Sequence, residues 1–252
     1  MHSNEITVEI CVDSLESAIA AERGGAKRVE LCSDLLEGGI SPSAGLIATA
    51  RKKISIGLHV MIRPRGGDFY YTDDEFDVMR RDVVMAKQFG ANGVVFGILD
   101  QDANVDIQRT RTLVDLARPL QTTYHRAFDM CADLSRSLEH VVEAGADRIL
   151  TSGGAQTAVE GTAMLRTLVE RANGRVIIMA CGKVDDQNVQ AVLEKTGVRE
   201  IHAALRTAVQ SPMKYRGKSI SMGTSGGGEY QRFVVPEDKV AKLVEATRRG
   251  LE

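Results

Sequence analysis

Residues 145–152 read GADRILTS, in which a glycine ends a predicted helix and a short apolar strand follows. The same pattern returns at residues 25–32 (GAKRVELC), 90–97 (GANGVVFG) and 197–204 (GVREIHAA). Glycine at this point is typical of a helix that ends in a left-handed turn. Two origins fit the repetition, either the general preference of such turns for glycine or a fourfold repeat in the chain's ancestry. In both cases the pattern gives the four strands a common register.

Further strand candidates lie between these repeats, and a helical pattern follows each one. The eight candidates span residues 6–12, 28–33, 57–63, 93–99, 121–127, 148–152, 175–180 and 200–205. Ser41 before Pro42 predicts one helix start, and Thr72 with Glu75 predicts another through a capping box. Eight strand–helix units in 252 residues predict an α/β fold, a single (β/α)8 TIM barrel. A doubly wound open sheet is the alternative.

The composition is that of an ordinary globular protein, with 43% hydrophobic and 26% charged residues. No shift in composition marks a linker, so we expect one domain over residues 1–252. A long loop is predicted at about 206–236, before the closing helix, and loops of this length are usually functional. It is a candidate cover for the barrel mouth or a contact with another subunit.

The charge balance of 32 basic against 34 acidic residues argues against nucleic acid and membrane surfaces as partners. No apolar run is long enough to span a bilayer, and residues 1–5 lack a signal-peptide pattern. The four cysteines, Cys11, Cys32, Cys131 and Cys181, form no C-x-x-C pair. We therefore expect free thiols in the reducing cytoplasm.

Alternation along the strands predicts which side chains face the barrel interior. In strand 28–33 the aliphatic Val29 and Leu31 face the helices, which leaves Glu30 and Cys32 inside. The same reasoning places further polar and soft side chains inside: Glu9, Cys11, His59, Met61, Arg63, His125, Ser152, Met179, Cys181 and His202. Buried ionisable groups are costly unless they are paired, so this set predicts a site at the C-terminal strand ends. A self-paired network, such as Glu30 with Arg63 or Glu9 with His202, is the structural alternative.

Several motifs in these strands and loops are specific: EICVDS at 9–14, RVELCS at 28–33, MIRPRGGDF at 61–69, HRAFD at 125–129 and LTSG at 150–153. Through them the chain resembles the CutC family of copper homeostasis proteins from Val8 to about Tyr230. The resemblance implies a TIM barrel, a cytoplasmic location, copper binding and self-association as a dimer or tetramer. Cys181 and Lys183 depart from the family pattern, which often has glycine or another small residue there.

The first functional hypothesis is copper binding and handling. Cys11 and Cys32 occupy equivalent positions on adjacent strands, and both are expected to point inward. Two thiolates, joined by the thioether of Met61 or an imidazole, would suit soft Cu(I). Cys181 is a further candidate soft ligand, whereas Cys131 is expected to be structural. The competing interpretation is a pair of small buried thiols that only fill space.

The second hypothesis is an enzyme that acts on an anionic small molecule, phosphorylated substrates included. The loop with Arg63 and Arg65 offers cationic donors, and Ser152 with Gly153 offers a second small cradle. The acid/base candidates are Glu9, Glu30, His125 and His202, with His59 as a further binding residue. Glu30 with His125 is the preferred acid/base pair, and Arg63 is the preferred anion clamp. No lysine faces inward, which disfavours Schiff-base chemistry, and no organic cofactor is indicated.

The third hypothesis is a non-catalytic scaffold that retains the barrel. It predicts a closed interior in which every polar group is paired. The expected partners under the first two hypotheses are a copper ion or a small anionic ligand.

Overall fold

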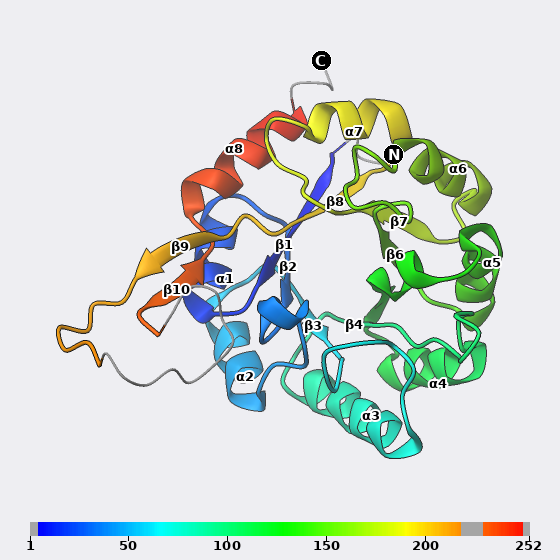
Figure 1. Cartoon of the computed structure of the whole chain (residues 1–252), viewed down its shortest axis with the longest axis horizontal. Coiled ribbons are helices and arrows are strands. Elements are labelled where there is room, and N and C mark those ends of the chain that lie inside the picture. Colours follow the sequence, from blue (N-terminus) through cyan, green and yellow to red (C-terminus); the bar gives the residue numbers. More distant parts are fainter. Residues whose placement is uncertain (1–4, 218–228, 249–252) are drawn as a thin grey trace.

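In the part of the chain that the structure describes, eight parallel strands close into a barrel in chain order, and eight helices surround it (Figure 1). The computed structural model describes residues 5–217 and 229–248. The strands of the ring are β1 Thr7–Val12, β2 Arg28–Leu31, β3 Gly57–Met61, β4 Gly93–Phe96, β5 Gln121–Tyr124, β6 Arg148–Thr151, β7 Ile177–Ala180 and β8 Glu200–Ala203. β8 pairs with β1, so the predicted (β/α)8 barrel is confirmed and the open-sheet alternative is wrong.

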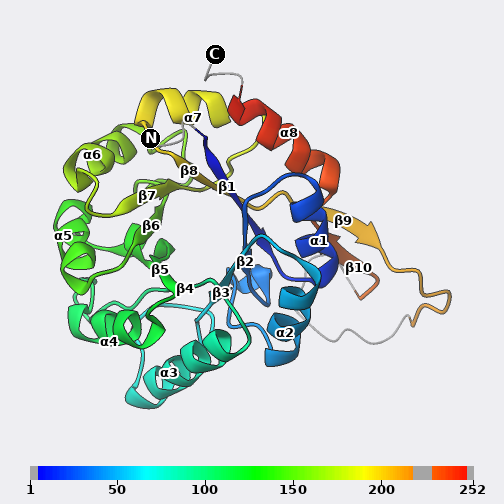
Figure 2. The same ribbon diagram turned by 180° about the vertical axis from the view of Figure 1, so that it is seen from behind.

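The helices form the outer ring, which is seen from both sides in Figures 1 and 2. They are α1 Leu15–Arg23, α2 Ala44–Lys53, α3 Asp73–Gln88, α4 Ile107–Ala117, α5 Leu134–Ala144, α6 Thr162–Ala172, α7 Val189–Thr196 and α8 Glu237–Arg248. Two short 3-10 turns, η1 Leu35–Glu37 and η2 Arg126–Met130, lie in the loops after β2 and β5. Among the described residues, no helix is long and apolar enough to cross a membrane.

The helix ends follow from local sequence. The repeated glycines Gly25, Gly90, Gly145 and Gly197 all have φ between +75° and +92°, the left-handed conformation that the pattern predicted. The capping box of Thr72 and Glu75 is present at the start of α3. The helix start predicted at Ser41 is wrong, because Ser43 caps α2 instead.

The strands are shorter than predicted at their C-terminal ends. β2 ends at Leu31, β3 at Met61 and β5 at Tyr124, so Cys32 and Arg63 lie just beyond their strands. Outward aliphatic side chains such as Val29 and Leu31 pack against the helices in the main hydrophobic core. The inward side chains form separate clusters, and those at the strand ends line the mouth of the barrel.

The segment predicted as a long loop contains two further strands, β9 Thr207–Gln210 and β10 Gln231–Val234. They pair antiparallel and extend outward from the ring near α1 (Figure 1). The amide of Val235 donates to Ser17 Oγ at 3.1 Å, which fastens the base of this hairpin to α1. Residues 218–228 of the predicted loop lie outside the described part of the chain.

Candidate functional site

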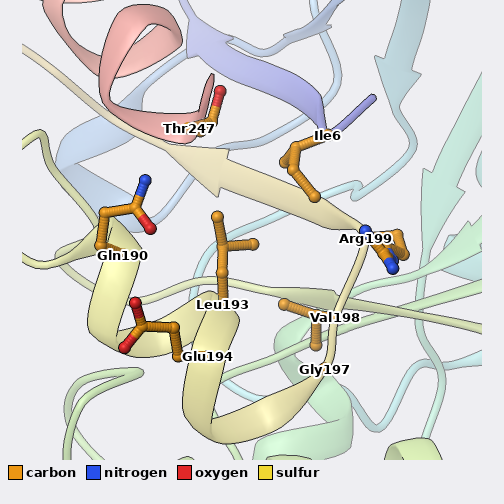
Figure 3. Close-up of a pocket in the computed structure, with 8 residues that line it drawn as sticks. All are labelled: Ile6, Gln190, Leu193, Glu194, Gly197, Val198, Arg199 and Thr247. Atoms are coloured by element: carbon orange, nitrogen blue, oxygen red, sulfur yellow. The ribbon is translucent and has the colours of Figure 1, made fainter. Parts of the chain in front are cut away.

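A pocket of about 220 Å³ opens at the N-terminal end of the barrel, between α7, α8 and the start of β1 (Figure 3). Two of its four polar side chains are hydrogen-bonded within the helices: Gln190 donates to the carbonyl of Ala246, and Thr247 donates to that of Val244. Barrel enzymes hold their active sites at the opposite, C-terminal end. The C-terminal end of the barrel, its mouth, is therefore the candidate site.

Four charged side chains lie one layer below the mouth and fill the centre of the barrel. We call Glu9, Arg28, Arg148 and Glu200 the floor network. Arg28 donates to Glu9 and, at 2.5 Å, to Glu200. Arg148 reaches both carboxylate oxygens of Glu200, at 2.6 and 2.9 Å.

Each charge of the floor network therefore has an opposite neighbour. Burial alone would raise the pKa of Glu9, but Arg28 and His202 hold it well below its usual range. Burial also opposes ionisation of Glu200, and the bonds and charges of Arg148 and Arg28 lower its pKa. Both carboxylates are thus ionised and compensated inside the barrel.

Directly above lie Cys11, Glu30, Cys32 and His202, which we call the mouth cluster. The two sulfur atoms are 3.9 Å apart, and they lie 3.3 Å (Cys11) and 3.4 Å (Cys32) from Glu30 Oε2. Both cysteines are free, and they share a small apolar cluster with Met61 and Val95. His202 Nε2 is 3.9 Å from Glu30 Oε2, and its Nδ1 is 2.7 Å from Glu9 Oε1.

The four side chains of the mouth cluster strongly shift one another's pKa values. The hydrogen bond from Cys32 lowers the pKa of Cys11 to about 5 against the effect of burial, and His202 adds to this. Cys32, whose pKa is raised by that same bond and by burial, keeps its proton. Burial and the Cys11 charge raise the pKa of Glu30. Burial opposes the charge on His202, but Glu30, Cys11 and Glu9 raise its pKa well above the usual value.

The mouth cluster opens into a cavity of about 110 Å³. The other walls of this mouth cavity are Gly38, Met61, Arg63, Phe69, His125, Arg126 and Leu150. The His125 ring packs on Phe69 with centroids 5.0 Å apart and lies over Gly97. A β-carbon at Gly97 would sit 2.5 Å from His125 Nδ1, so glycine is what allows the ring this position.

The two arginines of the RPRGGD motif have different surroundings. Arg63 is buried, and its guanidinium donates to the carbonyls of Glu37, Gly39 and Gly67, which ties the loops after β2 and β3 together. Arg65 lies outside the mouth cavity and pairs with Glu75 at 2.6 Å. Of the two predicted anion-binding arginines, only Arg63 lines the cavity.

The second predicted cradle, at Ser152 and Gly153, already holds an anionic group of the chain. The carboxylate of Asp129 accepts hydrogen bonds from the amides of Ser152 and Gly154 at 3.0–3.1 Å. It also accepts from the hydroxyls of Thr151 and Ser152. The backbone donors at the end of β6 are thus used to position η2, which contains Asp129.

The other residues predicted for the site lie in different environments. His59 lies below the mouth, over Gly93 and 3.8 Å from Glu9, and burial lowers its pKa to about 3. Cys181 belongs to a separate buried cluster with Leu150 and Met179. Cys131 lies at the end of η2, and Lys183 is exposed.

Sequence reasoning missed Arg28, Arg148 and Glu200 as interior residues, and it missed Asp129 and Arg126 as mouth residues. The signal for the first three was present, because each lies two positions before a residue that the same alternation placed inside. Asp129 and Arg126 follow β5, where no strand register applies. Their position depends on how η2 folds back onto β6.

The fold and the mouth cluster define a (β/α)8-barrel protein with two thiols, a carboxyl group and a charged imidazole at the C-terminal end of the barrel. The CutC family model matches residues 6–207, and the chain belongs to this family. A mouse relative named copper homeostasis protein cutC homolog is 46% identical over 95% of this chain and 89% of its own length. The human relative of that name is 45% identical, over 96% of this chain and 89% of its own. A Bacteroides fragilis CutC family protein is 44% identical over 96% of this chain and 98% of its own.

Solved structures agree with this assignment. A CutC protein from Streptococcus agalactiae is 34% identical, with a TM-score of 0.74, and the match covers 78% of this chain and 97% of that one. Thiamine phosphate pyrophosphorylase from Pyrococcus furiosus matches with a TM-score of 0.60 at 16% identity, over 99% of this chain and 98% of that one. The second likeness is one of fold alone.

Proposed function

We propose that the protein binds Cu(I) at the mouth of its barrel, through the thiolates of Cys11 and Cys32. The observation that carries this proposal is the distance of 3.9 Å between the two sulfur atoms, both of which belong to buried side chains. Cys11, Glu30 and Cys32 each offer a donor atom, and these atoms all lie within 4.8 Å of one another. Thiolate sulfur is the donor type that soft Cu(I) prefers.

The chemistry around the sulfurs supports the same ligand. Metal-binding thiols must give up their protons, and the pKa of Cys11 is already lowered to about 5. Two thiolates with one Cu(I) ion would together be negatively charged, and the charged imidazole of His202 offsets this charge. Met61 packs against both cysteines and supplies a third soft donor. The names of the mouse and human relatives point to copper as well.

The test is an anaerobic competition titration of Cu(I) against a strong chelator. Wild-type protein is expected to withdraw one Cu(I) per chain, and the Cys11→Ser/Cys32→Ser double variant to lose this binding. The Cys131→Ser/Cys181→Ser double variant is the matched control, because it removes the other two thiols and is expected to keep the site. Binding that the first double variant retains would place copper elsewhere.

A second candidate function is proton-transfer catalysis on an anionic small molecule. Glu30 and His202 support it, because their environments move both pKa values upward inside one cavity. His125, proposed from the sequence as the partner of Glu30, is better suited to donate a hydrogen bond. Burial and nearby Arg63 lower its pKa to about 3, so it stays neutral. A bell-shaped pH–rate profile that Glu30→Gln abolishes would identify the acid/base pair.

We also propose a cytoplasmic location and a homo-oligomer. Four free thiols, three of them buried, suit a reducing compartment. The hairpin of β9 and β10 extends outward from the ring and offers a surface to a second copy. Analytical ultracentrifugation distinguishes a monomer, which would contradict this assembly, from the expected dimer or tetramer.

A further inference from the structure

The mouth cavity has a buried positive charge without a counterion. Arg63 is only 6% exposed, and its three bonded acceptors are neutral carbonyl oxygens. Among the described residues, no carboxylate forms an ion pair with it; its guanidinium lies over the Phe69 ring, 5.0 Å from the centroid, and its Nε has no hydrogen-bond partner. A buried charge is costly unless an opposite charge compensates it. An anion in the cavity would provide that compensation.

His125 contributes a hydrogen-bond donor to the same cavity. Its Nδ1 accepts the amide of Ala127 at 3.1 Å, so the neutral ring carries its proton on Nε2. Within the described part of the chain, this Nε2 is buried without a partner. An orphaned donor in a cavity wall is best satisfied by an acceptor that enters the cavity.

Arg126, the next residue in the chain, contributes the other donor. Its Nε donates to Asp129 at 2.8 Å, and its Nη2 donates to Ser152 Oγ at 2.9 Å. These bonds hold the guanidinium in place, while Nη1 contacts none of the described acceptors. Arg126 also lines the cavity, unlike Arg65. The cavity thus presents two separate donors and one uncompensated positive charge.

The donor set favours a carboxylate over a phosphate. A phosphate is usually bound by several backbone amides, and the amides available at the end of β6 are occupied by Asp129. Only a single positive charge, that of Arg63, needs compensation, because Arg126 is paired with Asp129. Two donors and one charge match the two oxygens and single charge of a carboxylate.

The cavity volume matches that of a small ligand. About 110 Å³ corresponds to roughly four water molecules at about 30 Å³ each. We propose that the mouth cavity binds a small monocarboxylate of the size of acetate or lactate, which accepts hydrogen bonds from His125 Nε2 and Arg126 Nη1 and neutralises Arg63. This inference deepens the second candidate function and rests on it. It does not depend on the binding of copper.

The test is calorimetric titration of metal-free protein with acetate, lactate, hexanoate and inorganic phosphate at constant ionic strength. Acetate and lactate are expected to bind one per chain, whereas hexanoate and phosphate are expected to bind at least tenfold more weakly. Arg126→Gln is expected to weaken lactate binding roughly ten- to hundredfold, the usual effect of losing a hydrogen bond to a charged group. Arg65→Gln is the matched control and is expected to bind lactate like wild type.

A second measurement uses wild-type protein alone, so it does not depend on whether a variant folds. The Nε2–H resonance of His125 in wild-type protein is expected to shift on addition of lactate and to stay in place with chloride. Tighter binding of phosphate than of lactate would overturn the proposal, as would an unchanged affinity in Arg126→Gln. Because the titration measures binding to metal-free protein, its failure is distinct from a failure of turnover or of Cu(I) binding.

Discussion

The floor network and the mouth cluster lie in adjacent layers of the same barrel, and both are rich in ionisable side chains. In the floor network two arginines face two carboxylates, and each group has a charged partner within 3 Å. In the mouth, the buried atoms Glu30 Oε1 and His125 Nε2 have no partner among the described residues. Arg63, on the mouth cavity wall, has no counterion there either.

The difference indicates which layer maintains the fold and which one binds ligands. A compensated network of buried charges needs nothing further and excludes a ligand from the centre of the barrel. Unpaired groups beside a cavity have a stability cost that a bound ion or molecule can offset. The scaffold hypothesis, which required a fully paired interior, therefore describes the floor network and not the mouth.

Breaking the floor network is expected to have the largest effect on stability. Glu200→Gln leaves Arg148 without a carboxylate partner and should lower the free energy of unfolding by about 3–5 kcal/mol. In the mouth, Glu30→Gln should change it by less than about 1 kcal/mol, because a carboxyl with a raised pKa is already neutral and an amide can likewise donate a hydrogen bond to the Cys11 thiolate. Urea denaturation at neutral pH measures both. Equal losses in the two variants would refute the contrast.

The second prediction concerns acid sensitivity. The pKa of His125 falls from 6.5 to about 3 on folding, so between these values the unfolded state binds a proton that the folded state does not. Stability must therefore fall as the pH falls through this window, by up to about 1.4 kcal/mol per pH unit. His125→Gln should lose that slope relative to wild type, and His59→Gln should do the same for His59. Parallel curves of unfolding free energy against pH for wild type and both variants would contradict the prediction.

Gly93 in β4 and Gly97 just after it allow a matched comparison, with an expected effect on stability of intermediate size. An added β-carbon would lie 2.5 Å from the His125 ring at Gly97 and 2.5 Å from the His59 ring at Gly93. Each alanine substitution should cost about 1–3 kcal/mol, the usual effect of overpacking. Only Gly97→Ala displaces a ring of the mouth cavity, so only this variant should also weaken lactate binding. Thermal unfolding and the lactate titration together separate the two positions.

The smallest effect is expected at Arg65. Its bonds to Glu75 and Asp68 lie at the surface, where ion pairs contribute about 0–1 kcal/mol. Arg65→Gln should therefore change stability by no more than that, and Arg63→Gln should cost more because it leaves buried carbonyls without their donor. Denaturation of the two variants side by side measures the difference. A larger loss at Arg65 would mean that the two roles are reversed.

Much of the interior was predictable from strand alternation alone. Glu30 and Cys32 follow the aliphatic Val29 and Leu31 in strict alternation, and all four lie where the pattern placed them. The same alternation extends two residues earlier to Arg28, which was overlooked although it forms the centre of the floor network. The inward position of Arg28 is therefore contained in the sequence.

Other features could not be predicted from local pattern. Asp129 and Ser152 are separated by 23 positions, and no periodicity links a 3-10 turn to the end of the following strand. The glycine-rich motif at 151–154 has the composition of an anion cradle, and only the folded chain shows that its own carboxylate fills it. Likewise, Arg63 was expected to face a ligand with a free guanidinium, but most of its donors hold neighbouring loops.

The eight-unit barrel and the inward face of each strand follow from the amino-acid sequence, because both depend on the spacing of apolar residues and turns within short segments. Tertiary structure alone decided which inward groups are paired, how far apart the sulfur atoms of Cys11 and Cys32 lie, and where a cavity remains. Those properties depend on distances between residues far apart in the chain. Closure of the ring sets these distances, and charge compensation inside the barrel then separates a fully paired floor from a mouth that can accept a ligand.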